Sequence, residues 1–330
     1  MKASFFSLSL IVSILAVSFM NAQYSSKKVM KTHQEYTDSI KAVNYTKIFP
    51  LLGKKAYAKG FDIPHPLGVM LNYVYVTQNI NISNLKVGLG KDISIDGDQL
   101  IKWGTNTTSA HTVMVRPDLW VLPFLNVYGM MGVGKSTTQI EIEDIDLSST
   151  DLSRLPFDGK ALEILLKEQL TGPSAIQPIE NDINTAGFGI LAAGGVGPVW
   201  VSVDISMSWV FAKDLNPVNV IASGFRLGHN FVHASKPYRN IGLWTGAMRL
   251  QMSATTEGVK TIEDITGTPA QGGLTAIDPI SFNIDKSPVQ EWNGLVGAQY
   301  QHNKNWILRS ESGIFGNRKS FMLSLNYRFN

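Results

Sequence analysis

The stretch VWVSVDISMSWVF, residues 199–211, alternates between apolar and mainly small polar side chains. In an extended strand, successive side chains point to opposite faces. Strands of soluble proteins average about 5–6 residues, whereas a tilted strand needs about ten residues to cross a bilayer. The pattern therefore predicts a strand of membrane-spanning length. One of its faces holds only apolar residues: Val199, Val201, Val203, Ile205, Met207, Trp209 and Phe211.

The C-terminal stretch FMLSLNYRF, residues 321–329, has the same alternation. A soluble β-sandwich would bury such an apolar face in its core. Aromatic residues at both ends of the face instead fit the two aromatic girdles of a membrane barrel. The residues on this face are Phe321, Leu323, Leu325, Tyr327 and Phe329.

The first residues of the chain predict export. Lys2 precedes an apolar run from Phe5 to Phe19, and cleavage between Ala22 and Gln23 would release a signal peptide of residues 1–22. A single anchor helix is the alternative, but the run is short for a span of about 20 residues. No later stretch is long and apolar enough for a helical span, so the mature chain is either a soluble exported protein or a membrane β-barrel.

The composition excludes several kinds of chemistry. The chain has no cysteine, which removes disulfides, thiolate metal sites and cysteine nucleophiles. Its 29 Lys and Arg residues nearly balance 26 Asp and Glu residues, so no nucleic-acid partner is predicted. We expect neither a cofactor nor a metal ion.

Connections between the predicted strands alternate in length. The long set falls at 78–109, 138–183, 212–217, 255–289 and 316–318, and the short set at 122–123, 195–197, 232–239 and 303–304. Barrels of the bacterial outer membrane have long outer loops and short periplasmic turns, and a sandwich has no such rule. The strands themselves are predicted near 66–77, 110–121, 124–137, 184–194, 198–211, 218–231, 240–254, 290–302, 305–315 and 319–329.

These patterns predict an all-β fold, a closed antiparallel transmembrane β-barrel of about ten strands over residues 65–330. The count rises to twelve if residues 80–90 hold two more strand segments. Both termini are then periplasmic, and residues 23–64 form a periplasmic or plug-like N-terminal extension. Apolar residues at helical spacing predict an amphipathic helix at 158–170, with Asp158 as its cap.

On these features the chain resembles the outer-membrane β-barrel proteins of Gram-negative bacteria. The resemblance rests on the signal peptide, the alternating strands and the closing LSLNYRF, and it covers most of the mature chain. The stretch RPDLWVLPFLNVYG (116–129) also resembles a group of uncharacterised barrels of similar size, which implies no activity. The resemblance implies an outer-membrane location, with outer-membrane lipids and the barrel-assembly machinery as partners. Such proteins usually end in Phe, whereas here Asn330 follows Phe329.

If the apolar faces contact lipid, the opposite faces line the lumen. A charged residue that faces lipid near the bilayer midplane costs about 2–4 kcal/mol, so charged residues within the strands are predicted to point inward. They form either a structural network of ion pairs or a polar path for a solute. Side chains fill most of a barrel of this size, so a wide pore is not expected. The predicted lumen-lining polar residues are Asp204, Arg226, Arg249, Gln251, Gln299, Gln301, Arg309 and Glu311.

The stretch GMMGVGKSTT, residues 129–138, satisfies the phosphate-loop pattern G-x-x-x-x-G-K-[ST]. That pattern binds phosphate only where it follows a strand and opens a helix. Here TQIEIEDIDL follows, which alternates and offers no helix start, so no nucleotide partner is predicted. We interpret the stretch as the outer end of a membrane strand, where Lys135 contacts lipid phosphate.

Two classes of function other than transport remain open. An outer-membrane lipid-modifying enzyme needs a His near a Ser, and His229 and His233 with Ser223 and Ser235 are candidates, although nothing in the sequence fixes a triad. We therefore assign no catalytic residue, and an enzyme is the less favoured class. An adhesin or interaction scaffold would use the long outer loops. The favoured prediction is a narrow transporter or channel, or a structural barrel with a polar lumen, with a small solute as the partner of a conduit.

Overall fold

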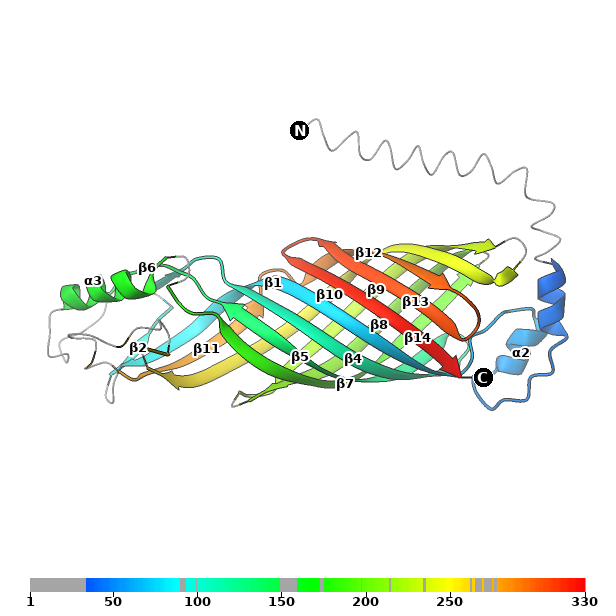
Figure 1. The fold of residues 1–330 in the computed structure, drawn as a ribbon, viewed down its shortest axis with the longest axis horizontal. Coiled ribbons are helices and arrows are strands. Elements are labelled where there is room, and N and C mark those ends of the chain that lie inside the picture. The colour runs from blue at the N-terminus through cyan, green and yellow to red at the C-terminus, as the bar shows by residue number, and fades with distance from the viewer. Residues whose placement is uncertain are drawn as a thin grey trace, which may run out of the picture.

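The protein folds around one closed antiparallel barrel of ten strands, as predicted. The ring is closed because β1 pairs with β4 on one side and with β14 on the other. Its strands are β1 (Leu67–Leu89), β4 (Thr107–Leu122), β5 (Leu125–Gln139), β7 (Ile179–Val196), β8 (Val199–Ala212), β9 (Val218–His233), β10 (Lys236–Lys260), β12 (Trp292–Gln301), β13 (Trp306–Phe315) and β14 (Arg318–Phe329). Figure 1 shows these strands tilted around the long axis.

The computed structural model describes residues 34–329 apart from short gaps. The predicted signal peptide and the capping residue Asp158 lie outside the described residues. Ser235, one of the candidate serines, also lies outside them. The gaps fall at 90–92, 99, 149–158, 173–174, 197, 214, 234–235, 262, 265–268, 270–274 and 276–277.

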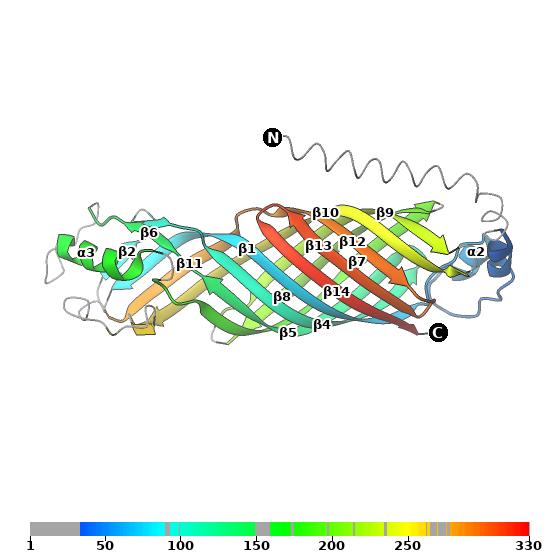
Figure 2. The ribbon, with the colours of Figure 1, turned by 45° about the horizontal axis from the view of Figure 1, so that its top comes forward.

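Additional strands continue the wall beyond the ring at the end opposite the C-terminus (Figures 1 and 2). There β11 (Ile280–Pro288) pairs with the far halves of β1 and β10, and β2 (Ile93–Asp96) pairs with β1. A second, two-stranded sheet joins β3 (Ile101–Trp103) to β6 (Ile142–Ile145). Residues 80–89 continue β1 instead of forming the two further strand segments left open for 80–90, and β2, β3 and β11 lie within the predicted loops 78–109 and 255–289. The helix α3 (Gly159–Leu170) agrees with the predicted helix at 158–170.

The end opposite the C-terminus, which is expected from the sequence to face outward from the cell, has an apolar core of its own. Ile82, Leu85, Ile140 and Ile284 form a buried cluster on the inner side of the extended strands, and Trp103 packs against them. Beyond the ring, the apolar side chains of the strands therefore point inward, into this core. Within the ring they point outward.

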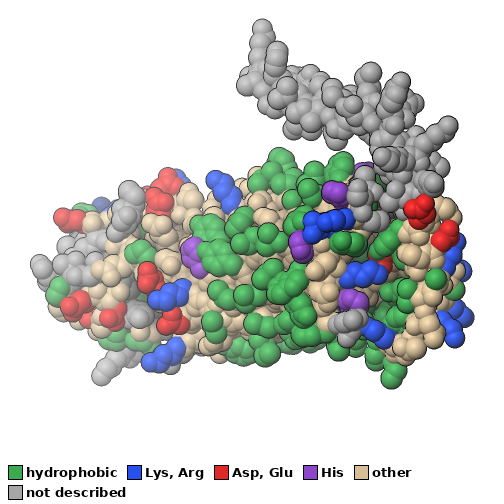
Figure 3. All heavy atoms as spheres, turned by 45° about the vertical axis from the view of Figure 1, so that its right-hand side comes forward, with side chains coloured by type: hydrophobic (Ala, Val, Ile, Leu, Met, Phe, Trp, Pro, Cys, Tyr) green, Lys and Arg blue, Asp and Glu red, His purple; other side chains and the backbone are tan. Residues whose placement is uncertain are grey.

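The outward face of the ring is apolar and exposed. Val201, Val203 and Ile205 on β8 are 43%, 55% and 48% exposed, while Ser202 between them is buried. Figure 3 shows the resulting band of hydrophobic side chains, with charged side chains gathered towards the ends of the barrel. A continuous apolar band on a closed barrel is stable only in lipid. The protein is accordingly a membrane-spanning β-barrel. Among the described residues, no helix combines the length and the apolar character needed to cross a membrane.

The N-terminal extension packs against the end of the barrel where the C-terminus lies (Figure 1). Its helical segments, residues 34–41 and α2 (Gly53–Ala58), enclose a small cluster of Ile40, Tyr57 and Ile63. The extension is joined to the barrel by a hydrogen bond from the Leu51 amide to the Val121 carbonyl, 2.8 Å long, at the β4–β5 turn.

An ion pair between Lys304 Nζ and Asp62, 2.8 Å apart, joins the extension to the β12–β13 turn. Burial, helped by the hydrogen bond to Asp62, raises the pKa of Tyr36. Burial and nearby cations lower the pKa of His65, which precedes β1. The extension is therefore a folded cap that is held to the barrel by a hydrogen bond and an ion pair.

Candidate functional site

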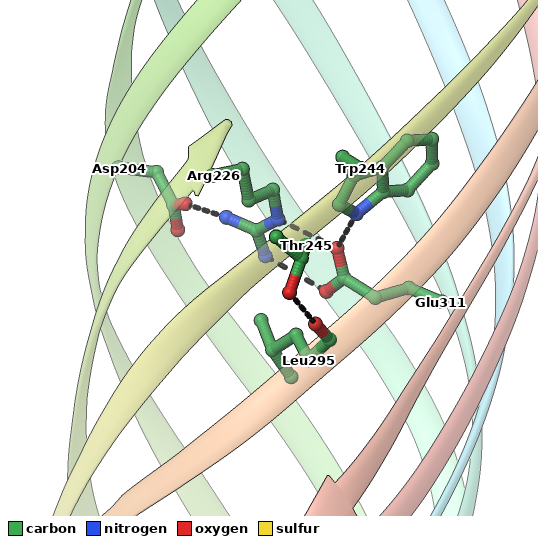
Figure 4. Close-up of polar contacts among 6 residues, drawn as sticks. All are labelled: Asp204, Arg226, Trp244, Thr245, Leu295 and Glu311. Carbon is green, nitrogen blue, oxygen red and sulfur yellow. Dashed lines mark hydrogen bonds and ion pairs between the residues drawn. The ribbon is translucent and has the colours of Figure 1, made fainter. Parts of the chain in front are cut away.

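A buried ion-pair network lies inside the barrel between β8, β9, β10 and β13 (Figure 4). The guanidinium of Arg226 donates to both carboxylate oxygens of Glu311, from Nε at 2.6 Å and from Nη2 at 2.8 Å. Its Nη1 donates to Asp204. The indole Nε1 of Trp244 donates to Glu311 at 2.8 Å. The side chains of Arg226 and Glu311 are 8% and 7% exposed, so the pair is largely removed from solvent.

Glycines on the inner face give these large side chains their room. A Cβ at Gly224 would lie 2.7 Å from the Asp204 carboxylate and 2.8 Å from Arg226 Nη1. A Cβ at Gly297 would lie 2.2 Å from the Trp244 ring. The network therefore depends on small residues placed opposite large ones on neighbouring strands.

Two further arginines stack on aromatic rings of the same inner face. The Arg309 guanidinium lies 4.5 Å from the centroid of the Trp244 ring, and that of Arg116 lies 3.5 Å from the Tyr128 ring. Cation–π contacts of this kind hold a guanidinium in place without neutralising its charge. In the contacts described, neither Arg309 nor Arg116 has a hydrogen bond to a carboxylate.

A second buried pair lies near the end of the barrel where the C-terminus lies. Arg328 donates to Asp118, which also accepts a 2.7 Å hydrogen bond from Asn126 Nδ2. Arg328 Nε donates to the His65 carbonyl at 2.9 Å, which links the pair to the start of β1. The side chains of Arg328 and Asp118 are only 5% and 4% exposed.

A fifth inward arginine, Arg318, lies towards the end of the ring opposite the C-terminus. It is 1% exposed, and its Nη2 donates to the Met248 carbonyl at 3.2 Å. Its Nε and Nη1 have no hydrogen-bond partner among the described residues. Asn293, which pairs with Met248 in register and is 3% exposed, likewise has both amide atoms unpartnered.

Six of the eight predicted lumen residues lie on the inner face. Asp204, Arg226, Arg309 and Glu311 come together at the network, and Gln299 and Gln301 lie lower on β12. Gln301 accepts a 3.1 Å hydrogen bond from Asn240 Nδ2. Sequence reasoning did not select Arg116, Asp118, Trp244, Arg318 and Arg328 as lumen residues, although the alternation of their strands carried the necessary signal.

The predictions for Arg249 and Gln251 are wrong, because both residues face outward. On β10 they alternate in step with Leu243, which is 47% exposed and faces outward. The inward face of the same strand carries Trp244, which is buried. Arg249 is directly opposite Trp292, which is 54% exposed, and pairs with Glu291 at 2.7 Å. In this part of β10 the inward positions are Met248, Leu250 and Met252. The apolar residues therefore already point inward here, and the polar residues point outward.

Lys135 lies on the outward face of β5, as predicted from the alternation. Its ammonium is 3.9 Å from Asp182, and both side chains are strongly exposed. In register it lies beside His111, which hydrogen-bonds the Tyr73 hydroxyl at 2.8 Å. The whole stretch 129–138 is strand, so it lacks the helix of a phosphate loop. The contact of Lys135 with lipid phosphate stays a prediction.

The described candidates for lipid chemistry, His229 and Ser223, do not lie close together. His229 and Ser223 share the outward face of β9, and six residues of strand separate their Cα atoms by about 20 Å. The His229 ring instead packs on Phe231, with centroids 4.5 Å apart. No group of three or more metal-ligating side chains occurs among the residues described here.

Comparison with known proteins gives the following. No protein-family model matches the chain, and no curated protein matches it significantly. Among solved structures it is similar to the outer membrane protein OprG from Pseudomonas aeruginosa, with 10% identity, 82% of this chain and 100% of that chain covered, and a TM-score of 0.36. It is also similar to the transport unit of the autotransporter AIDA-I from Escherichia coli, with 8% identity, 90% and 99% covered, and a TM-score of 0.34.

A third similar structure is the toluene transporter TbuX from Ralstonia pickettii, with 10% identity, 81% and 90% of the two chains covered, and a TM-score of 0.31. These identities and scores are too low to assign a function to the chain.

Proposed function

We propose that the protein is a narrow outer-membrane conduit for small polar solutes, closed at rest by the network of Asp204, Arg226, Trp244 and Glu311. The observation that carries this proposal is the position of a buried ion pair inside the ring. A barrel of eight strands is already filled by its own side chains, and ten strands enclose only slightly more space. A few large side chains are therefore enough to close the lumen.

The chemistry of the network suits a closure that opens better than it suits a permanent filler. Burying an ion pair costs desolvation energy that its Coulomb attraction barely repays, so apolar side chains of equal volume stabilise a core as well or better. In stability alone, a structural barrel would gain little from charges at this level. An ion pair beside lumen water, in contrast, can separate and be solvated when the conduit opens.

Unpartnered polar atoms on the inner face support the presence of water around the network. Asn72 Oδ1 and Ser324 Oγ lie on β1 and β14 at the level of Arg309, Asn326 Oδ1 lies towards the periplasmic end, and Gln78 Oε1 lies towards the outer end. Buried polar groups in proteins almost always have hydrogen-bond partners, and ordered water supplies them where protein does not. These atoms outline a hydrated path along β1 and β14 that the network interrupts.

Planar-bilayer recording of the purified, refolded protein tests the proposal. We expect small, infrequent openings from the wild type and longer openings from Glu311→Gln or Arg226→Gln. Arg249→Gln is the matched control, because it also removes an arginine from an ion pair, but on the outward face. If all variants are folded by gel mobility and none conducts, the protein is a structural barrel and the proposal is wrong.

A further inference from the structure

The charges on the inner face of the ring do not balance. Where the described strands pair with one another within the ring, alternation places five arginines and three carboxylates inward, which leaves a net charge of two positive there. The arginines are Arg116, Arg226, Arg309, Arg318 and Arg328, and the carboxylates are Asp118, Asp204 and Glu311. The excess is carried by side chains that make cation–π contacts or that hydrogen-bond a backbone carbonyl.

Arg318 is the most deeply buried of these cations. Its hydrogen bond to the Met248 carbonyl leaves Nε and Nη1 unpartnered, and both amide atoms of Asn293 beside Met248 are unpartnered. A Cβ at Gly313 would lie 2.3 Å from Asn293 Nδ2 and 2.5 Å from Ser320 Oγ, so these polar groups crowd one point of the inner wall. Arg318, the Asn293 amide and the Ser320 hydroxyl offer N–H and O–H donors at this point, beside two unpartnered acceptors, Asn293 Oδ1 and Gln78 Oε1.

The described carboxylate near this height does not neutralise Arg318. Glu291 pairs with Arg249 on the outward face, at 2.7 Å. A buried cation without a counter-charge is unfavourable unless an anion or water completes its surroundings. Unsatisfied guanidinium N–H groups beside an amide N–H form the kind of donor set that holds small oxyanions and halides.

The approach from the outer end carries another cation. Lys286 on β11 lies opposite Ile82 and Ala254, which are both buried, so it faces the inner side above the ring. Burial lowers the pKa of Lys286, and an anion beside its ammonium would offset that burial.

We infer that Arg318 and Asn293 form a binding site for small anions, and that the conduit passes anions in preference to cations. The second half of this inference rests on the proposed function, whereas the binding site does not. The ligand class is set by the donors: a small inorganic anion or a compact organic carboxylate or phosphate.

Reversal potentials in a KCl gradient test permeation. We expect a chloride-to-potassium permeability ratio above one for the wild type or, where its openings are too rare, for the longer-opening Glu311→Gln variant. A unit charge about 7 Å from an ion in water-like surroundings changes its partition roughly threefold. Chloride and potassium change in opposite directions, so Arg318→Gln should lower the ratio by about an order of magnitude at low salt. Arg318→Lys should preserve the ratio, and Arg249→Gln should not change it.

Binding is tested separately from conduction, by urea unfolding of the folded barrel with and without inorganic phosphate at constant ionic strength. A ligand that binds the native state raises the unfolding midpoint. We expect a rise for the wild type and Arg318→Lys and a smaller rise for Arg318→Gln, with Arg249→Gln behaving as wild type.

The outcomes separate the two proposals. Conduction that is not anion-selective overturns the inference of selectivity and leaves the conduit intact. No conduction together with phosphate stabilisation that requires Arg318 overturns the conduit and supports the anion site. Equal stabilisation of wild type and Arg318→Gln overturns the site.

Discussion

Replacing Glu311 by glutamine is the sharpest perturbation that the barrel offers. Glu311 accepts three hydrogen bonds inside the ring, two from Arg226 and one from Trp244. The amide of the variant keeps the shape of the side chain and one acceptor oxygen. It loses the charge, and its NH₂ group is turned towards a guanidinium or an indole N–H. Arg226 then retains Asp204 as its only charged partner in the network.

The magnitude follows from the burial of the pair. A hydrogen bond to a charged group contributes about 1.5–3 kcal/mol, and removing one member of a buried ion pair costs about 3–5 kcal/mol. Because Asp204 still compensates Arg226 in part, we expect a loss of about 3 kcal/mol in the free energy of unfolding. If the lumen were open to water at this level, the loss would fall below about 1 kcal/mol, as it does for exposed pairs.

Reversible urea unfolding in phospholipid vesicles measures the loss, with tryptophan fluorescence and gel mobility as two probes of the folded state. The double variant Arg226→Met with Glu311→Leu is the internal control. It removes both charges at similar volume and should recover most of the loss, because apolar pairs replace buried ion pairs at little cost. A loss below about 1 kcal/mol for Glu311→Gln, or a double variant less stable than the single one, would refute the claim that this pair is desolvated.

Three more predictions use the same folded barrel. Asp118→Asn should destabilise it by about 3 kcal/mol in urea, because Arg328 loses its buried counter-charge; a change within error would mean that the pair is solvated. Val203→Arg should cost about 2–4 kcal/mol and Val199→Arg, nearer the periplasmic turn, at most about 1 kcal/mol; equal costs would contradict the assigned depth. The pKa of His65 is lowered in the docked state, so the undocked state binds more protons and acid favours undocking of the cap as pH falls below about 6.5. The protection factor of the Leu51 amide, which is its exchange corrected for the intrinsic pH dependence, should fall over that range in the wild type and not in His65→Gln, and a pH-independent protection factor in both would contradict the assignment.

The ring could be predicted from sequence because its signal is local. Alternation of apolar and polar residues over ten or more positions predicts each membrane strand, and short turns connect many of them. The strand β11 could not be predicted in the same way. Its residues 280–288 pair with the far halves of β1 and β10, which lie about 200 and 30 residues away in the chain. The local sequence of 280–288 does not indicate either of these partners.

The candidate site was predicted less completely, for two physical reasons. The rule that apolar residues face outward holds only where the outside is hydrocarbon. Arg249 and Gln251 lie where that condition ends, and their face was therefore predicted wrongly. The alternation also gives the face of a residue but not its partner across the lumen. The contacts of Arg226 with Glu311, and of Arg328 with Asp118, join strands that are 85 and 210 residues apart in sequence.

The closing network and the net charge of the lumen can be separated by a pair of variants. Glu311→Gln and Arg226→Gln both break the ion pair, so both should lengthen openings. They change the inward charge in opposite directions, from two positive to three positive in the first and to one positive in the second. The chloride-to-potassium permeability ratio should therefore rise in Glu311→Gln and fall in Arg226→Gln, with Arg249→Gln as the unchanged reference.

Measured at low salt, where screening is weakest, opposite shifts would show that one set of side chains both closes the conduit and sets its selectivity. Shifts in the same direction would mean that selectivity is fixed elsewhere in the lumen. Arg318 alone would then have to account for any anion preference.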